Sequence, residues 1–206
     1  ANTFTVSQSL NQTTGGLTKL GAGTLVLSGS NSYTGVTTAS AGVLRLNSAN
    51  ALPGGVGSTG GSSALTINGG VIGLGNGNFT RGLGTGVTQV QITGGGGFAA
   101  YGSDRTVNLG GNATPTSLTW GSSSFITTSG SAFILGAANA DRTVDFQNPI
   151  ALGASARTVQ VDDGSADVDA TLSGVLSGAG GGLTKTGLGT LTLSAANTYT
   201  GTTSIN

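Results

Sequence analysis

Apolar and polar residues alternate along this chain in short runs, and turn-forming residues separate the runs. Residues 24–27 read TLVL and residues 43–46 read VLRL, with leucine at alternate positions. A period of two places successive side chains on opposite faces of a strand. Because Gly, Asn, Asp or Ser bounds nearly every run, the pattern predicts short strands joined by tight turns. Further strands are predicted at 64–67, 71–74, 87–92, 106–109, 117–120, 125–127, 132–135, 143–146, 158–161 and 190–193.

The beginning of the chain is nearly repeated at its end. The segment LTKLGAGTLVLSGSNSYTG at 17–35 returns as LTKTGLGTLTLSAANTYTG at 183–201, with a constant offset of 166. We therefore interpret 1–206 as a single segment with related repeats at 1–53 and 167–206. A duplication of this length favours a stacked architecture in which equivalent segments occupy equivalent positions.

Strands at this spacing fit a β-sandwich, a barrel or a β-solenoid. The duplication favours the solenoid, and so does a weaker echo, in which DRTV occurs at 104–107 and again at 141–144. At ~20–30 residues per coil, the chain would form about seven to ten coils. The glycine runs at 94–97 and 180–182 are predicted to be turns between strands.

Composition supports a folded all-β chain. Of the 206 residues, 40 are glycine, 36% are hydrophobic and only 7% are charged. Disordered chains are poor in apolar residues, so a buried core is expected. Glu, His, Cys and Met are absent, and Lys occurs only twice. Helices are disfavoured by this usage. The scattered basic residues make nucleic acid an unexpected partner, and no apolar run is long enough to span a membrane.

The duplicated segment resembles a known repeat. G-G-L-T-K-x-G-x-G-T-L-x-L-S-x-x-N-x-Y-T-G, at 15–35 and 181–201, is similar to the autotransporter-associated β-strand repeat of passenger regions in bacterial surface proteins. The resemblance is specific over 15–53 and 181–204; between 54 and 165 only composition and strand rhythm agree. It implies a right-handed parallel β-helix, located outside the cell or on the bacterial cell surface. It also implies a scaffold role, because the repeat carries no catalytic residues.

The polar residues of the motif have structural interpretations. Gly21 and Gly23 permit a tight corner with a positive φ angle. Asn31 suits a bend where its amide bonds to backbone or to an Asn of the next coil. Lys19 and Lys185 are interpreted as solvated or edge-protecting charges. Covalent attachment through these lysines is the alternative.

One acidic cluster invites a comparison with calcium sites. Asp162, Asp163, Asp167 and Asp169 lie within a single short stretch. Calcium takes six to eight oxygen ligands, so these carboxylates are candidates for a weak site. The spacing matches no EF-hand loop, however, and a solvated turn is the favoured interpretation. We therefore predict no metal site and no cofactor.

The sequence also contains candidate residues for catalysis and for stacking against sugars. Asp162, Asp163 and Asp167 could imitate the carboxylates of a polysaccharide-cleaving β-helix. The chain has no His or Cys, which excludes Ser-His-Asp and Cys-His systems and typical zinc sites. We predict that the protein is not an enzyme. Phe98, Tyr101 and Trp120 could form a glycan-stacking surface, although core positions are favoured.

The sequence thus predicts an extracellular structural or adhesive rod, or a fibre-forming repeat unit. The alternative is a module that binds glycans or host surfaces, and a polysaccharide-cleaving enzyme ranks below both. Expected partners are further copies of the chain, arranged head to tail or laterally, and glycans. Because the second repeat breaks off after TGTTSIN, we expect the chain to be part of a longer repetitive protein.

Overall fold

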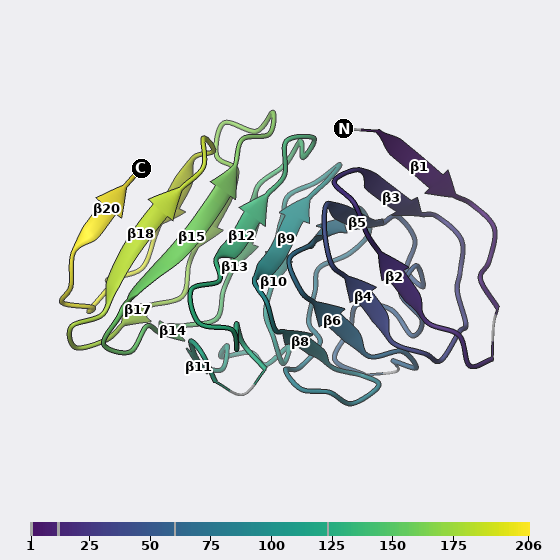
Figure 1. The fold of residues 1–206 in the computed structure, drawn as a ribbon, viewed down its shortest axis with the longest axis horizontal. Coiled ribbons are helices and arrows are strands. Elements are labelled where there is room, and N and C mark those ends of the chain that lie inside the picture. Colours follow the sequence, from purple (N-terminus) through teal and green to yellow (C-terminus); the bar gives the residue numbers. More distant parts are fainter. Residues whose placement is uncertain (1, 12, 60, 123) are drawn as a thin grey trace.

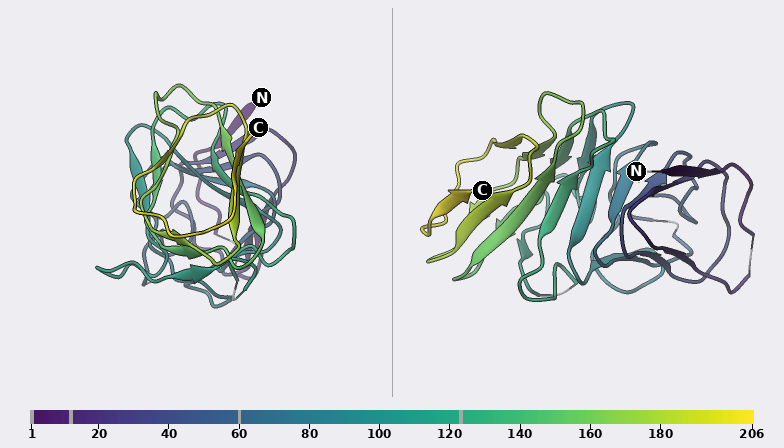
Figure 2. Two further views of the ribbon diagram at one scale, coloured as in Figure 1. Left: turned by 90° about the vertical axis from the view of Figure 1, so that its left-hand side faces the viewer. Right: turned by 45° about the horizontal axis from the view of Figure 1, so that its top comes forward.

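A computed structural model describes residues 2–11, 13–59, 61–122 and 124–206. These residues form twenty β-strands and no helix, and so none that is long and apolar enough to cross a membrane. The strands wind in successive coils along one axis, and the first and last strands lie at opposite ends of the stack (Figure 1). Seen end-on, the coils outline a closed loop around the core (Figure 2).

The strands are short, with two to seven residues each. Their bounds are β1 Thr3–Val6, β2 Leu17–Lys19, β3 Thr24–Leu27, β4 Thr37–Ala39, β5 Val43–Leu46, β6 Leu65–Ile67, β7 Val71–Leu74, β8 Val90–Ile92, β9 Gly96–Ala100, β10 Arg105–Val107, β11 Leu118–Thr119, β12 Phe133–Gly136, β13 Val144–Phe146, β14 Ile150–Ala151, β15 Ala156–Asp162, β16 Ala170–Leu172, β17 Leu176–Ser177, β18 Gly182–Thr186, β19 Leu191–Leu193 and β20 Thr203–Ile205.

Four parallel sheets line the sides of the stack. Sheet A has nine strands in the order β1-β3-β5-β7-β9-β12-β15-β18-β20 and runs the whole length. Sheet B is β2-β4-β6-β8, sheet C is β10-β13-β16-β19, and sheet D is β11-β14-β17. Every pairing between these strands is parallel. The chain is therefore a parallel β-helix, which confirms the predicted fold class.

The coils differ in length because loops are inserted at the corners. In sheet A, Thr24 pairs with Val43, 19 residues further on. Gly97 pairs with Ile134, which is 37 residues further on. Because a parallel strand can be reached only by a full crossover, each extra residue must leave the stack as a loop.

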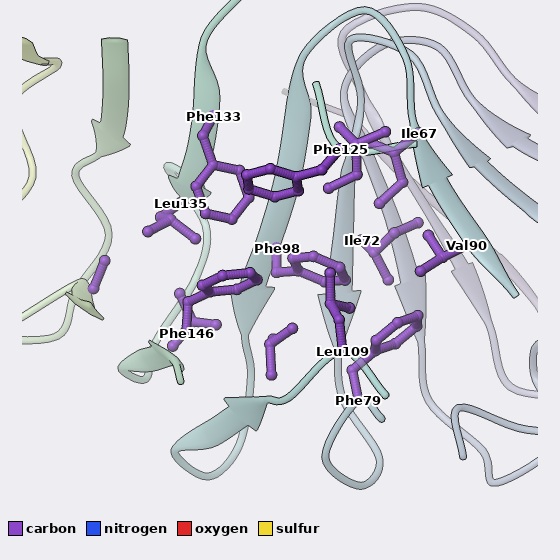
Figure 3. Close-up of a cluster of buried hydrophobic side chains, with 14 of the residues drawn as sticks. Ile67, Ile72, Phe79, Val90, Phe98, Leu109, Phe125, Phe133, Leu135 and Phe146 are labelled. Atoms are coloured by element: carbon purple, nitrogen blue, oxygen red, sulfur yellow. The ribbon is translucent and has the colours of Figure 1, made fainter. Parts of the chain in front are cut away.

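The core is a set of columns of apolar side chains that point inward from successive coils. In sheet A the register aligns Leu44, Ile72, Phe98, Leu135 and Val161, all fully buried. Figure 3 shows the middle of this core, where buried phenylalanines fill the space between the sheets. Such stacking explains how strands of a few residues can be stable, because each buries its inward face against two neighbouring coils.

Glycine has two distinct uses in this stack. Gly42 turns a corner with φ 60°, and a Cβ there would meet Gly21 O of the preceding coil at 2.6 Å. Gly21 also has positive φ, as predicted, whereas Gly23, for which the same was expected, does not. The prediction that 94–97 and 180–182 are turns is wrong in part, since Gly97 lies within β9 and Gly182 begins β18. A side chain at Gly97 would meet the Phe133 ring at 3.0 Å, so this strand position must be glycine.

A loop after β12 covers part of the outer face of sheet A. The strands of sheet A turn progressively along the stack, so that β1 and β3 run at a large angle to β15 and β18 (Figure 1). This turn brings the loop against β3, where Asn139 Nδ2 donates to Thr24 Oγ1 at 3.0 Å. Asn139 Oδ1 accepts a bond of 2.7 Å from the Tyr101 hydroxyl. Val43 and Val71 pack beneath as a second apolar cluster.

Candidate functional site

The two copies of the repeated segment make the same contacts. Leu10 N donates to Asn31 Oδ1 at 2.8 Å in the first copy, and Leu176 N donates to Asn197 Oδ1 at 2.7 Å in the second. Each pair joins a coil to the coil that precedes it. Because all four residues keep the offset of 166, the motif fixes a particular junction between consecutive coils.

A tyrosine–threonine pair repeats in the same way. Tyr33 and Thr37 share a hydrogen bond of 2.8 Å between their hydroxyls, and Tyr199 and Thr203 share one of 2.6 Å. Backbone bonds repeat too, since Ser32 N donates to Leu10 O as the amide 166 positions later donates to Leu176 O. These contacts to the preceding coil and within the coil are thus reproduced in both copies.

The two copies nevertheless lie on different faces of the stack. The first Leu-Thr-Lys strand, β2, belongs to sheet B, whereas its counterpart β18 belongs to sheet A. Likewise β3 lies in sheet A and β19 in sheet C. We expected equivalent segments to occupy equivalent positions. This is wrong for the face of the stack on which each copy lies, but correct for the contacts that each copy makes with the preceding coil. Loops of unequal length between the copies explain the difference, because the 166 intervening positions do not complete a whole number of turns.

The motif side chains also contact the following coil, but only in the first copy. Asn31 Nδ2 donates to Ala51 O at 2.6 Å, and Thr37 Oγ1 lies 3.0 Å from Ser63 Oγ. In the second copy, the bonds given for Asn197 and Thr203 are to the preceding coil and to the same coil. In the first copy, Asn31 therefore links its coil both to the preceding and to the following coil.

The motif side chains are also more deeply buried in the first copy than in the second. Tyr33 is 2% exposed and Asn31 5% exposed, whereas Tyr199 and Asn197 are half-buried. On the last coil, Ile205 is 79% exposed. It borders a hollow of about 240 Å³ with leucines of β18 and β19. Leu191 and Leu193 of β19 are half-buried as well.

Lys19 is not the solvated charge that the sequence predicted. It is only 6% exposed. Its Nζ donates to Leu20 O at 2.8 Å, to Gly21 O at 2.6 Å and to Ala41 O of the following coil at 3.0 Å. Burial lowers the pKa of Lys19. Lys185 makes the corresponding bond to Gly187 O. Both lysines donate hydrogen bonds to backbone carbonyls at the corners of the coils. The buried Lys19 amine is therefore not accessible for covalent attachment.

Arg81 is a functional residue that the sequence analysis missed. It is fully buried, and its guanidinium donates to Pro53 O at 2.9 Å, Gly55 O at 2.6 Å and Ser63 O at 2.6 Å. Burial lowers the pKa of Arg81 to about 10. Burial also raises the pKa of Tyr33. The sequence signal was an arginine in a glycine-rich stretch with no acidic residue nearby. A buried guanidinium without a carboxylate partner needs backbone carbonyls as acceptors.

The calcium candidates do not converge on one point. Asp169 is buried and its two oxygens accept Gly164 N at 2.7 Å and Thr190 N at 2.9 Å. Asp162 accepts Gln160 Nε2 at 2.7 Å, while Asp163 and Asp167 are exposed. Within 2–11, 13–59, 61–122 and 124–206, no three acidic, His or Cys side chains are placed to hold a metal ion.

The aromatic residues belong to the core, not to a sugar-stacking surface. Phe98, Tyr101 and Trp120 are at most 5% exposed. Trp120 packs edge-on against Phe125, with 5.8 Å between ring centroids. Arg45 lies 4.2 Å above the Tyr101 ring and covers it from solvent. The alternative of an exposed aromatic glycan platform at these three residues is therefore wrong.

Comparison with known proteins identifies the repeated segment. The family model described as passenger-associated-transport-repeat matches residues 17–46 and 183–206. No curated protein and no solved structure matches the chain. The two matched ranges coincide with the strands and corners whose junction geometry is duplicated. The chain therefore contains two segments that match the passenger-associated-transport-repeat model, and they lie on different faces of one parallel β-helix.

Proposed function

We propose that this chain is a rod-forming segment of an extracellular or cell-surface bacterial protein. In this proposal, the repeat acts as a coupling coil that joins one stretch of β-helix to the next. The observation that carries it is the set of bonds that Asn31, Thr37 and Lys19 make to the following coil. The second copy has the same residue types at the corresponding positions. Location outside the cell is supported by the passenger repeat at both matched ranges.

The coupling explains how the rod stays continuous although its loops vary. The motif specifies contacts between adjacent coils and does not depend on which face it occupies, as β2 and β18 illustrate. Between two copies of the repeat, loop lengths can therefore vary and the motif can move to another face of the stack. The parallel hydrogen bonding between successive coils continues unchanged. Adhesive display would follow from loops carried on such a rod, and a structural role requires only the rod itself. We propose no catalytic activity.

The experiment joins two copies at equivalent positions. Thr203 corresponds to Thr37, so a gene in which residue 202 is followed directly by residues 37–206 keeps the junction intact. We expect one longer rod, extended by ~4.8 Å for each added coil, in small-angle X-ray scattering and electron microscopy. A matched control joins residue 206 to residue 1 and so breaks the register.

The outcomes separate clearly. A single elongated particle for the in-register fusion, with a bent or two-bodied particle for the control, supports the coupling role. Two independently tumbling bodies in the in-register fusion would contradict it. Antibody labelling of intact bacterial cells that produce the parent protein tests location, and labelling only after lysis would contradict the surface proposal.

A further inference from the structure

A cleft lies on the side of the stack where one sheet stops and another begins. Sheet B ends with β8 and sheet D begins with β11. β11 lies in the long coil between β9 and β12, in which Gly97 pairs with Ile134. The cleft has a volume of about 360 Å³. It is lined by β11, by the segments on either side of β11 and by Leu83 of the preceding coil. It shares no residue with either motif coil, so it is independent of the coupling role proposed above.

The lining divides into an apolar floor and a hydroxyl rim. Leu118 and Phe125 are buried, whereas Thr116, Thr119 and Ser117 are exposed. Among the lining residues that the structure describes, none is charged. A charged ligand would lose hydration here without gaining a counter-ion, so the cleft favours a neutral one.

The rim offers both donors and acceptors. Thr116 Oγ1 accepts a bond of 3.0 Å from Asn112 Nδ2, so its own O–H remains a donor. Ser122 Oγ donates to Thr119 O at 3.0 Å, so its oxygen remains an acceptor. Ligand hydroxyls, which both donate and accept, can satisfy each type of group.

A buried asparagine holds one wall of the cleft in place. Asn148 is 1% exposed, and its Oδ1 accepts Leu109 N at 2.7 Å. Its Nδ2 donates to Leu109 O at 3.0 Å and to Thr116 O at 2.9 Å. One side chain thus ties both ends of the loop 109–116, and the wall is formed before any ligand arrives. Preorganisation of this kind reduces the entropy lost on binding.

The backbone next to the cleft is unusual. Ser124 and Ile126 have φ angles of 73° and 50°, and they flank Phe125, a fully buried residue that borders the cleft. A positive φ is a genuine outlier for a β-branched residue such as isoleucine. Strained backbone of this kind clusters at binding and catalytic sites, where surrounding contacts hold it in place.

We propose that this cleft binds a neutral saccharide. A sugar ring presents an apolar C–H face, which would rest on half-buried Leu83 and on the edge of Leu118. Its hydroxyls would meet the threonine and serine rim. Charged sugars are disfavoured because the lining supplies no compensating charge. The site gives a surface rod a specific recognition point away from its ends.

Trp120 provides a direct measurement, because it is the only tryptophan and packs against Phe125. The whole chain is titrated with lactose, maltose, cellobiose and N-acetylneuraminic acid, and binding is followed by tryptophan fluorescence and ligand-observed NMR. We expect at least one neutral disaccharide to bind with a Kd of about 1 mM or tighter. The charged sugar should bind at least about tenfold more weakly.

Hydroxyl deletion tests the position of the site. The double substitution Thr116→Val and Thr119→Val should weaken binding at least about tenfold. The thermal midpoint should be unchanged, because both side chains are exposed. Thr192→Val makes the same chemical change on exposed β19 and should leave binding unaltered. Absence of neutral-sugar binding, equal binding by the double variant, tighter binding of the charged sugar, or occupancy by an apolar peptide instead would each overturn the proposal.

Discussion

At the scale of single residues, the polar side chains of the repeat act as links between coils. Asn31 was expected to bond to backbone at a bend, and its two amide bonds to Leu10 N and Ala51 O confirm this. Lys19 was misjudged although a signal existed. It stands two positions after Leu17 on the same strand, and alternation places both side chains on the inward face. The positive charge of Lys19 suggested an exposed side chain, but its position in the alternation of the strand correctly indicates a buried one.

Substitution of the two lysines measures the value of this link. Lys19→Met keeps the buried chain but leaves the carbonyls of Leu20, Gly21 and Ala41 without their donor. Unfolding in urea should show a loss of about 1–3 kcal/mol. Lys185→Met is the matched control in the second copy and should cost less, because that lysine is only half-buried. Equal losses would contradict a role in holding the following coil.

Tyr101 gives the fold a dependence on alkaline pH. Burial raises the pKa of Tyr101 to about 12, with Asp141 adding to the rise and Arg45 opposing it. Between pH 10 and 12 the unfolded chain loses this proton first, so stability should fall as pH rises, by roughly 2 kcal/mol at pH 12. Tyr101→Phe should remove this part of the slope in urea titrations at each pH. An unchanged slope would show that Tyr101 ionises freely in the folded protein.

At the scale of elements, short runs rich in leucine and β-branched residues were predicted most accurately. The strands expected at 24–27, 43–46 and 71–74 coincide with β3, β5 and β7. β9 was missed because its glycines and alanines are selected by close neighbours, which the local sequence cannot reveal. The run 125–127 is no strand, since Phe125 forms only isolated bridges, to Ile92 and to Ser122. For the candidate site, the motif located the junction but not its face, which depends on loop lengths elsewhere.

The corner glycines can be tested with a matched pair. Gly42→Ala places a methyl group against Gly21 O and forces alanine into φ 60°. We expect a loss of about 1–3 kcal/mol in urea unfolding from the combined strain and contact. Gly82→Ala is the control, because a Cβ there meets nothing within 4 Å and no positive φ is involved. A comparable loss in both variants would show that the corner geometry is not decisive.

At the scale of the whole molecule, coils contact chiefly their neighbours, but one hydrogen bond spans a much longer distance in sequence. Asn139 reaches Thr24 across a sequence separation of 115 and joins the turned halves of sheet A. A double-mutant cycle with Asn139→Ala and Thr24→Val should give a coupling energy of about 1 kcal/mol in urea unfolding. A cycle of Asn139→Ala with distant Thr192→Val should give none. Equal coupling in both cycles would mean that the loop does not tie the halves together.

The duplicated junction allows the effect of a following coil to be measured inside one molecule. Ser32 N donates to Leu10 O and Thr198 N donates to Leu176 O, so the two amides make equivalent bonds. The first lies in a coil covered on both sides and the second in the last coil. Because a coil with one neighbour opens more readily, Ser32 should exchange its amide hydrogen at least about tenfold more slowly than Thr198. In the in-register fusion, Thr198 should slow to the rate of Ser32. Equal rates in the single chain would show that a following coil adds nothing to the junction, and the coupling role would then lose its energetic basis.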